Sequence, residues 1–142
     1  MSEAESKTQK KEVNSLLKRA KKDLINENFD ECISTSTSVL KLDKSNLLAL
    51  IFTGDCLQAK KRPDEALKYY VKACEFSPND RLGWKGQLSI LVGLPDFVAF
   101  FDTLTSFAKV LVSNKDELTE VVIYIKDYTE THGLDFKPMK LY

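Results

Sequence analysis

The most constraining feature of this sequence is a repeat with a period of 34 residues. Asn46, Asp80 and Asn114 recur at that spacing, and each stands just before a segment whose apolar residues follow a helical period. Asn and Asp are favoured at a helix N-cap, because their short side chains accept hydrogen bonds from unpaired N–H groups of the first turn. Glu117 follows Asn114 by three residues, which is the spacing of a capping box. Three caps in phase therefore predict three helix starts in phase.

Residues 47–80 are expected to form two antiparallel helices. A glycine inside a helix costs about 1 kcal/mol relative to alanine, so Gly54 predicts the close approach of a neighbouring helix. Pro63 fits the first turn of the second helix, where its missing N–H is no loss. The two stripes at helical spacing are Leu50, Gly54 and Leu57 on the first helix, and Ala66, Tyr70 and Ala73 on the second.

The stretch "LLALIFTGDCLQAKKRPDEALKYYVKACEFSPND" resembles a tetratricopeptide repeat (TPR). The resemblance implies an all-α fold, a right-handed TPR superhelix (alpha-alpha solenoid) of about seven helices. The residues that match the signature positions are Leu50, Gly54, Leu57, Ala66, Tyr70, Ala73 and Pro78.

In this register a polar segment, residues 1–11, is expected to be disordered, and residues 12–142 form the TPR solenoid. Leu88 and Phe100 replace two small residues of the third repeat, so its helices are expected to pack farther apart. The solenoid is divided into repeats 13–46 and 47–80, a degenerate repeat 81–114 and a half repeat 115–132.

A seventh helix, from about Lys115 to Thr131, has one apolar face, and Gly133 is a natural stop after it. It looks like the first helix of a fourth repeat whose partner helix is missing. Two interpretations stay open: the segment "LDFKPMKLY" folds back over it, or the chain continues into a longer solenoid.

The resemblance implies that partner proteins bind the concave face, which is lined mainly by the first helix of each repeat. An alternative interpretation assigns the apolar members to packing between repeats. A clamp for two carboxylates, used by TPR proteins that dock chaperone tails, is not expected, because Lys21 is the only base at the clamp positions. In this register the concave-face residues are Leu17, Lys21, Ile51, Phe52, Asp55, Lys85 and Ser89.

No pattern in the sequence predicts catalysis, a metal site or a cofactor. His132 is the single histidine. It falls at a helix end, and no sequence pattern pairs it with a catalytic base. The three cysteines lack metal-ligand spacing, and the five glycines form no phosphate-binding loop. We therefore expect a protein that is not an enzyme and that uses no cofactor.

The charge balance and the cysteines indicate which partners and which cellular compartment suit this protein. Twenty-one basic and twenty-one acidic side chains cancel, so no global field attracts nucleic acid. The stretch "KTQKKEVNSLLKRAKK" is basic, but no aromatic residue interleaves with its cations to stack a base, which argues against direct RNA contact. The cysteines and the polar N-terminus predict a cytoplasmic protein, or one also found in the nucleus. The apolar runs are too short to cross a membrane.

The order of the motifs resembles a narrower family. Repeats that begin close to Met1, the sequence "VLKLDKSNLLALIFTGDCL" and the later "LGWKGQLSIL" together resemble the N-terminus of the large TPR scaffold subunits of superkiller (Ski) complexes. This resemblance implies a non-enzymatic scaffold that supports cytoplasmic 3′-to-5′ exosome-mediated mRNA decay. Its partners would be a helicase, a beta-propeller subunit or an exosome adaptor.

Two other functions stay open at this point. One is a generic TPR adaptor, of the co-chaperone or import-receptor type, that binds a peptide. The other is a homodimeric interaction module, because an aromatic stripe on the sixth helix would mark an interface if it were left uncovered. The stripe consists of Phe97, Phe100, Phe101 and Phe107.

Overall fold

The computed structural model describes residues 2–134, and these form seven helices without a strand. Every connection between helices is short, as expected for helices that pack against their neighbours in sequence. The helices are α1 (Glu3–Ile25), α2 (Phe29–Leu42), α3 (Leu47–Ala59), α4 (Pro63–Phe76), α5 (Arg81–Leu91), α6 (Phe97–Ser113) and α7 (Thr119–Thr131).

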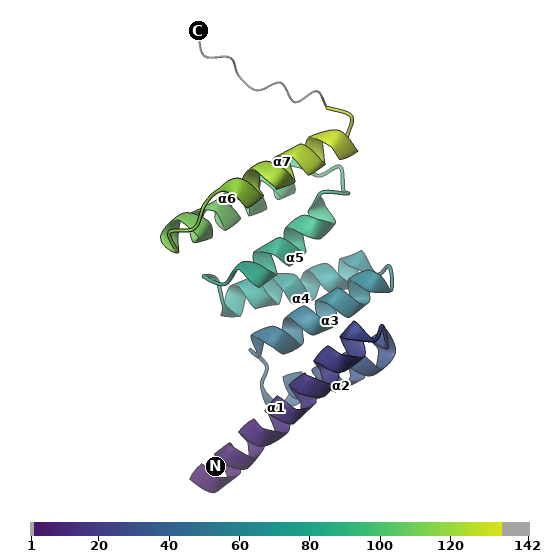
Figure 1. Ribbon diagram of the computed structural model, residues 1–142, viewed down its shortest axis with the longest axis vertical. Coiled ribbons are helices and arrows are strands. Elements are labelled where there is room, and N and C mark those ends of the chain that lie inside the picture. The colour runs from purple at the N-terminus through teal and green to yellow at the C-terminus, as the bar shows by residue number, and fades with distance from the viewer. Residues whose placement is uncertain (1, 135–142) are drawn as a thin grey trace.

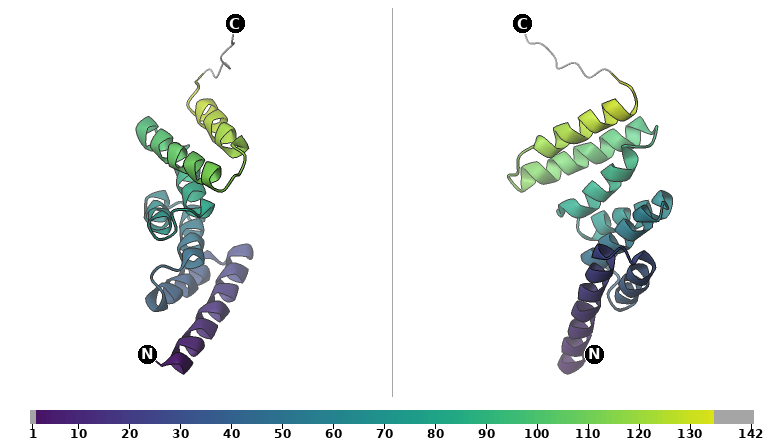
Figure 2. Two further views of the ribbon diagram at one scale, coloured as in Figure 1. Left: turned by 90° about the vertical axis from the view of Figure 1, so that its left-hand side faces the viewer. Right: turned by 45° about the vertical axis from the view of Figure 1, so that its right-hand side comes forward.

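The helices stack in chain order into an elongated two-layer solenoid (Figure 1). Helices α1, α3, α5 and α7 form one layer, and α2, α4 and α6 form the other, as the left view of Figure 2 shows. Each helix packs on the next one in sequence, and α3 also contacts both α1 and α5. The predicted all-α class and the pairing of helices are confirmed.

Two of the three predicted N-caps are confirmed, and the third is wrong. The side chain of Asn46 accepts from the N–H of Ala49 at 3.0 Å, and that of Asp80 accepts from Leu82 at 2.8 Å. Asn114 instead ends α6 as its C-cap, and α7 begins four residues later than expected. The third repeat has no proline where Pro78 ends the second repeat, so α6 continues to Ser113.

The expectation that residues 1–11 are disordered is also wrong, because α1 begins at Glu3. Ser2 and Glu5 form a reciprocal capping box, with N–H to side-chain oxygen distances of 3.3 and 3.2 Å. The amide of Gln9 then donates to the carbonyl oxygen of Leu42 at 3.2 Å, which fastens the first turns of α1 to the end of α2. Local capping and this single long-range bond order a segment whose polar composition indicates disorder.

The close approach predicted at Gly54 is confirmed, but the approaching group is an aromatic ring. A Cβ at Gly54 would lie 2.7 Å from Cε1 of Tyr70, and a Cβ at Gly86 would lie 2.3 Å from Cδ1 of the same ring. Tyr70 is fully buried. Glycines on α3 and α5 therefore hold the α4 ring between two successive repeats.

The aromatic stripe on α6 is largely internal. Phe100 and Phe107 are fully buried, whereas Phe97 is 56% exposed. The ring of Phe100 stacks on that of Tyr128 from α7, with centroids 4.3 Å apart. Burial against α5 and α7 thus accounts for most of the stripe, and dimerisation through its exposed end stays a prediction.

The C-terminal end of the described chain follows the expected pattern. Helix α7 ends at Thr131, and Gly133 adopts a φ of +66°, the left-handed conformation that favours glycine after a helix. Residues 135–142, which we assign to the solenoid from sequence, lie outside the described residues. Among the described helices, none has the length and apolarity needed to cross a membrane.

Candidate functional site

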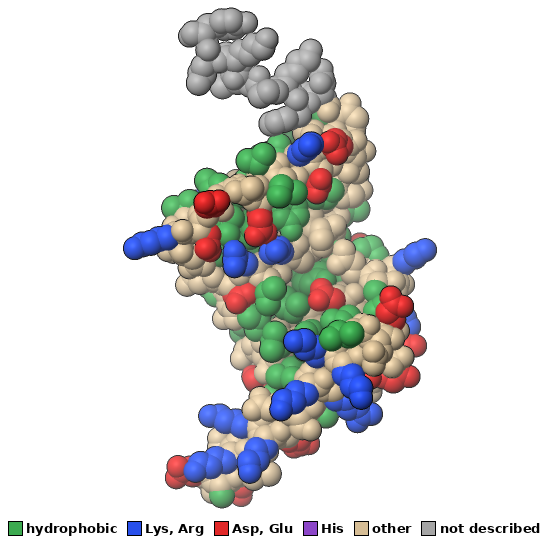
Figure 3. All heavy atoms as spheres, in the orientation of Figure 1, with side chains coloured by type: hydrophobic (Ala, Val, Ile, Leu, Met, Phe, Trp, Pro, Cys, Tyr) green, Lys and Arg blue, Asp and Glu red, His purple; other side chains and the backbone are tan. Residues whose placement is uncertain are grey.

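The predicted binding surface lies on the layer formed by α1, α3, α5 and α7, which we call the A-helix face. Figure 3 shows hydrophobic side chains gathered over its middle, with lysine and arginine side chains around α1. Leu48, Phe52 and Asp55 share one side of α3, because they are spaced by four and three residues. Leu82 and Ser89 hold the corresponding positions on α5, 34 residues after Leu48 and Asp55.

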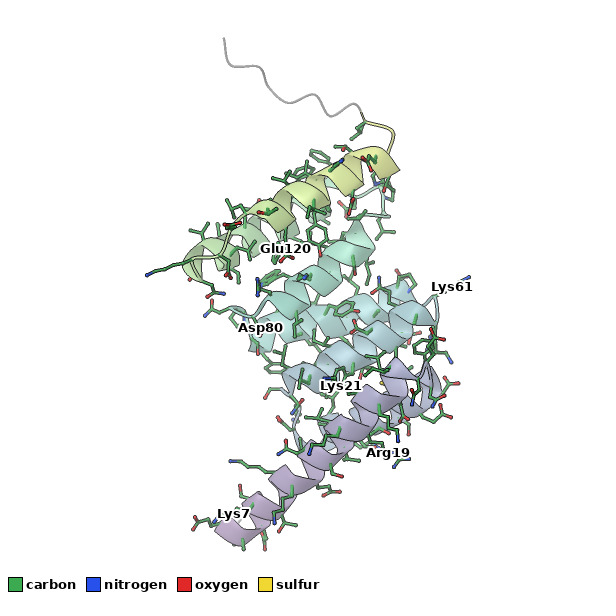
Figure 4. The ribbon with its side chains drawn as sticks, viewed as in Figure 1. Lys7, Arg19, Lys21, Lys61, Asp80 and Glu120 are labelled. Atoms are coloured by element: carbon green, nitrogen blue, oxygen red, sulfur yellow. The ribbon has the colours of Figure 1, made fainter. Side chains whose placement is uncertain are left out.

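Five of the predicted residues come from α1 and α3, and four of these, Leu17, Lys21, Ile51 and Phe52, differ in exposure. Lys21 is exposed and lies on the side of α1 next to α3 (Figure 4). Leu17 and Phe52 are half-buried, and each packs against a small core cluster. Ile51 is only 6% exposed and belongs to the main core cluster, so for Ile51 the alternative interpretation, packing between repeats, applies.

The other predicted residues lie in polar contacts between elements. The hydroxyl of Tyr70 donates to Oδ1 of Asp55 at 2.5 Å and lies 3.1 Å from Oε1 of Gln58. Nε2 of Gln58 in turn donates to Oγ of Ser89 at 3.2 Å. One polar chain therefore connects α3, α4 and α5 under the A-helix face.

Burial raises the pKa of the Asp55 carboxyl, and the hydrogen bond from Tyr70 opposes that rise. The pKa of Tyr70 is raised as well, first by burial and then by the adjacent Asp55 carboxylate. The protein thus keeps a half-buried carboxylate that accepts from a neutral phenol. Such a carboxylate is expected to make the stability of the fold depend on pH.

Replacing Asp55 by asparagine should stabilise the protein progressively, relative to wild type, as the pH rises from about 4. The raised pKa means that folded wild type binds a proton more tightly than the unfolded chain. Wild type therefore loses stability as the pH rises from the ordinary value through the raised one. The asparagine variant keeps an acceptor for Tyr70 and lacks this loss. Urea unfolding across that pH range measures the difference.

Asp102, an exposed carboxylate on α6, provides the matched control. Asp102→Asn should change stability little, because the side chain it alters is exposed. A difference between Asp55→Asn and wild type that shrinks as the pH rises would contradict the assignment.

Charged residues connect α5 to α7 at the upper end of the A-helix face. Nζ of Lys85 lies 3.1 Å from Oε2 of Glu120, and Arg81 lies within 4 Å of both Asp116 and Glu120. Figure 4 shows Glu120 on the side of α7 that faces α5. Lys85 is therefore partly neutralised within the chain, which leaves Lys21 as the freer cation of the predicted set.

Sequence reasoning missed three residues of this face, namely Leu48, Gln58 and Glu120. Leu48 is 43% exposed, and Leu82, 34 residues later, is 42% exposed. The repeat register could have identified this pair, because the same helix position carries an apolar residue in two successive repeats. The contacts of Gln58 and Glu120 depend on neighbouring repeats and have no local signal.

The titratable groups expected to be inert are buried or engaged. Cys32, Cys56 and Cys74 are buried free thiols. Burial raises the pKa of all three, that of Cys74 to about 11, so few thiolates form near neutrality. Nε2 of His132 lies 2.9 Å from the carbonyl oxygen of Val92. Among residues 2–134, no group of three or more metal-ligating side chains comes together.

Comparisons with known proteins agree with this architecture. No family model matches the chain. It is 30% identical over 136 residues to Superkiller protein 3 of Saccharomyces cerevisiae, covering 85% of this chain and 10% of that protein. It is 37% identical over 76 residues to Tetratricopeptide repeat protein 37 of Xenopus laevis, and 36% identical over 76 residues to Superkiller complex protein 3 of Homo sapiens. These two alignments cover 54% of this chain and 5% of each relative.

Among solved structures, the MamA protein superposes with a TM-score of 0.62 at 15% identity, covering 86% of this chain and 74% of MamA. The stacked helical pairs and this likeness define the fold as an all-α helical repeat, and one relative in sequence carries the name Tetratricopeptide repeat protein 37. Within that class it is a protein similar to Superkiller protein 3. The chain spans about a tenth or less of the length of these relatives.

Proposed function

We propose that this chain is the N-terminal TPR arm of a Ski-complex-like scaffold and that it acts by binding proteins rather than by catalysis. The observation that carries the proposal is the 30% identity to Superkiller protein 3, which extends over nearly the whole described solenoid. An alignment of this extent includes the degenerate third repeat, where a generic TPR signature is weakest. This favours the superkiller assignment over an unrelated TPR adaptor.

The proposed binding surface is the A-helix face. Leu48 and Leu82 expose apolar side chains there, while Lys21 and Asp55 supply charges of both signs. Exposed apolar residues bordered by polar ones suit a protein partner, because burial supplies affinity and the charges orient the chain. The partners proposed from the resemblance are a helicase, a beta-propeller subunit or an exosome adaptor. The complex would support 3′-to-5′ mRNA decay in the cytoplasm.

Affinity co-purification from the native lysate, with and without nuclease, tests this proposal. Recovery of a superkiller helicase, its propeller subunit or exosome components is expected, and it should resist nuclease because the contact is between proteins. The double variant Leu48→Ser and Leu82→Ser should reduce that recovery at least about tenfold, since it removes the exposed apolar anchors.

Val98→Ser is the matched control, because Val98 is exposed on α6 in the other layer. It should recover the same partners as wild type. Recovery of chaperones or import machinery without any superkiller or exosome subunit would overturn the assignment. Recovery that disappears with nuclease would show that RNA, and not this face, connects the proteins.

A further inference from the structure

The outer surface of α4 lies on the layer opposite the A-helix face (Figure 2), and three hollows border it. A hollow of about 280 Å³ lies between α2 and α4, one of about 370 Å³ follows α4 itself, and one of about 420 Å³ lies between α4 and α5. The first two share Lys72 and Glu75, and the last two share Val71 and Glu75. They form one continuous surface, which we call the α4 furrow.

The floor of the α4 furrow is apolar. Phe76 is 51% exposed and Val71 is 37% exposed, and they are bordered by the half-buried Leu40, Leu67 and Tyr69. Leu67 and Val71 lie on the same side of α4, because they are spaced by one helical turn, and Glu75 continues that side. Exposed apolar side chains such as Val71 and Phe76, bordered by charged ones, indicate a contact surface.

The rim of the furrow is basic, although the chain as a whole has no net charge. Lys44, Lys68 and Lys72 line it, and Glu75 is the single acidic residue among the lining side chains. Within residues 2–134 none of these three lysines forms a salt bridge. The furrow therefore combines a net positive charge with apolar side chains.

We propose that the α4 furrow binds an acidic linear segment of a partner protein, distinct from any partner bound on the A-helix face. An apolar side chain of the segment enters the hollow between α2 and α4, beside Phe76. Its flanking carboxylates lie over Lys44 and Lys72, where charge-assisted hydrogen bonds fix the orientation. This inference concerns a second surface and goes beyond the proposed function.

The furrow favours a peptide over a nucleic acid. Nζ of Lys72 lies 5.8 Å from the centroid of the Tyr69 ring, so that cation covers the face on which a base would stack. The remaining contacts on the floor are mostly aliphatic, which suits a peptide side chain better than a planar base. The hollow beside Phe76 is small for a drug-sized ligand and matches one or two side chains.

Selection from a phage-displayed random peptide library on the intact chain tests the inference directly. The enriched peptides are expected to carry an excess of Asp and Glu around one large apolar residue. A fluorescein-labelled enriched peptide should bind with a Kd that rises at least about tenfold in Lys44→Glu/Lys72→Glu, and by a similar factor in Phe76→Ser. Added salt should also weaken binding.

Two controls separate this surface from the rest of the molecule. Lys109→Glu reverses a charge on exposed α6, and Leu48→Ser alters the A-helix face; both should bind the peptide like wild type. Circular dichroism shows whether each variant is folded. If Lys44→Glu/Lys72→Glu does not fold, Phe76→Ser alone tests the surface. The two proposals can fail separately, because Leu48→Ser and Lys72→Glu report on different surfaces.

Three results would overturn the inference. The first is a selection that enriches no peptide, or peptides without acidic excess. The second is peptide binding that is lost in Leu48→Ser and kept in Lys44→Glu/Lys72→Glu. The third is poly(U) RNA binding that depends on the same lysines while the acidic peptide does not bind.

Discussion

Gly86→Ala is expected to destabilise the fold by about 1–3 kcal/mol, the range for forcing an extra methyl group into a packed core. The added Cβ would lie 2.3 Å from Cδ1 of Tyr70, and the ring cannot swing away because it is fully buried against Gly54 on its other side. Alanine by itself favours a helix over glycine by about 1 kcal/mol, so any net loss reports the steric contact. Urea unfolding followed by circular dichroism measures this change.

Gly93→Ala is the matched control for this substitution. A Cβ at Gly93 meets only the carbonyl oxygen of Ile90, at the ordinary distance of 3.7 Å. That variant should be as stable as wild type or slightly more stable. Adding Tyr70→Leu to Gly86→Ala should make the effect of the alanine smaller than it is in the wild-type background. If Gly86→Ala were as stable as wild type, the described packing of the ring between two glycines would be wrong.

Phe100→Ala should cost about 3–5 kcal/mol, the range for removing a buried aromatic side chain. Phe100 is fully buried, stacks on Tyr128 of α7 at 4.3 Å and meets the edge of Phe101 at 5.1 Å. In a solenoid each repeat contacts mainly its neighbours, so the loss should open α6 and α7 first. Hydrogen exchange should show fast amides in these two helices while α3 and α4 stay protected.

Phe97→Ala tests whether the effect depends on burial. Phe97 begins the same helix and is more than half exposed, so its removal should cost less than about 1 kcal/mol. Equal losses for the two variants would be evidence against the described α6–α7 packing. Uniform exchange along the whole chain in Phe100→Ala would contradict the expected local opening.

Features that depend on nearby residues could be predicted from the sequence. Pro63 opens α4, the side chain of Asp80 caps α5, and Gly133 follows the end of α7 in a left-handed conformation. Each of these depends on backbone geometry within one helical turn. The prediction at Asn114 failed because the end of α6 competes for the same residue, and cap chemistry alone does not say which helix uses it.

The residues of the proposed A-helix face could be predicted only in part. The helical register placed Lys21 on α1 and Phe52 on α3, both in the A-helix layer, but it also selected Ile51, which the core buries. Leu48 was not predicted, although Leu82, at the same position of the next repeat, is exposed to a similar extent. The helical register specifies on which side of a helix a residue lies. The exposure of its side chain depends on how closely the next repeat packs against that side.

The sequence by itself determined the number, order and pairing of the helices, because capping, proline geometry and apolar periodicity act over a few residues. Only the tertiary structure decided that the Tyr70 ring lies between Gly54 and Gly86, that Lys85 is paired with Glu120 and that α4 carries a basic, apolar furrow. These features join residues from different helices. Their energies depend on distances that exist only once the repeats have stacked.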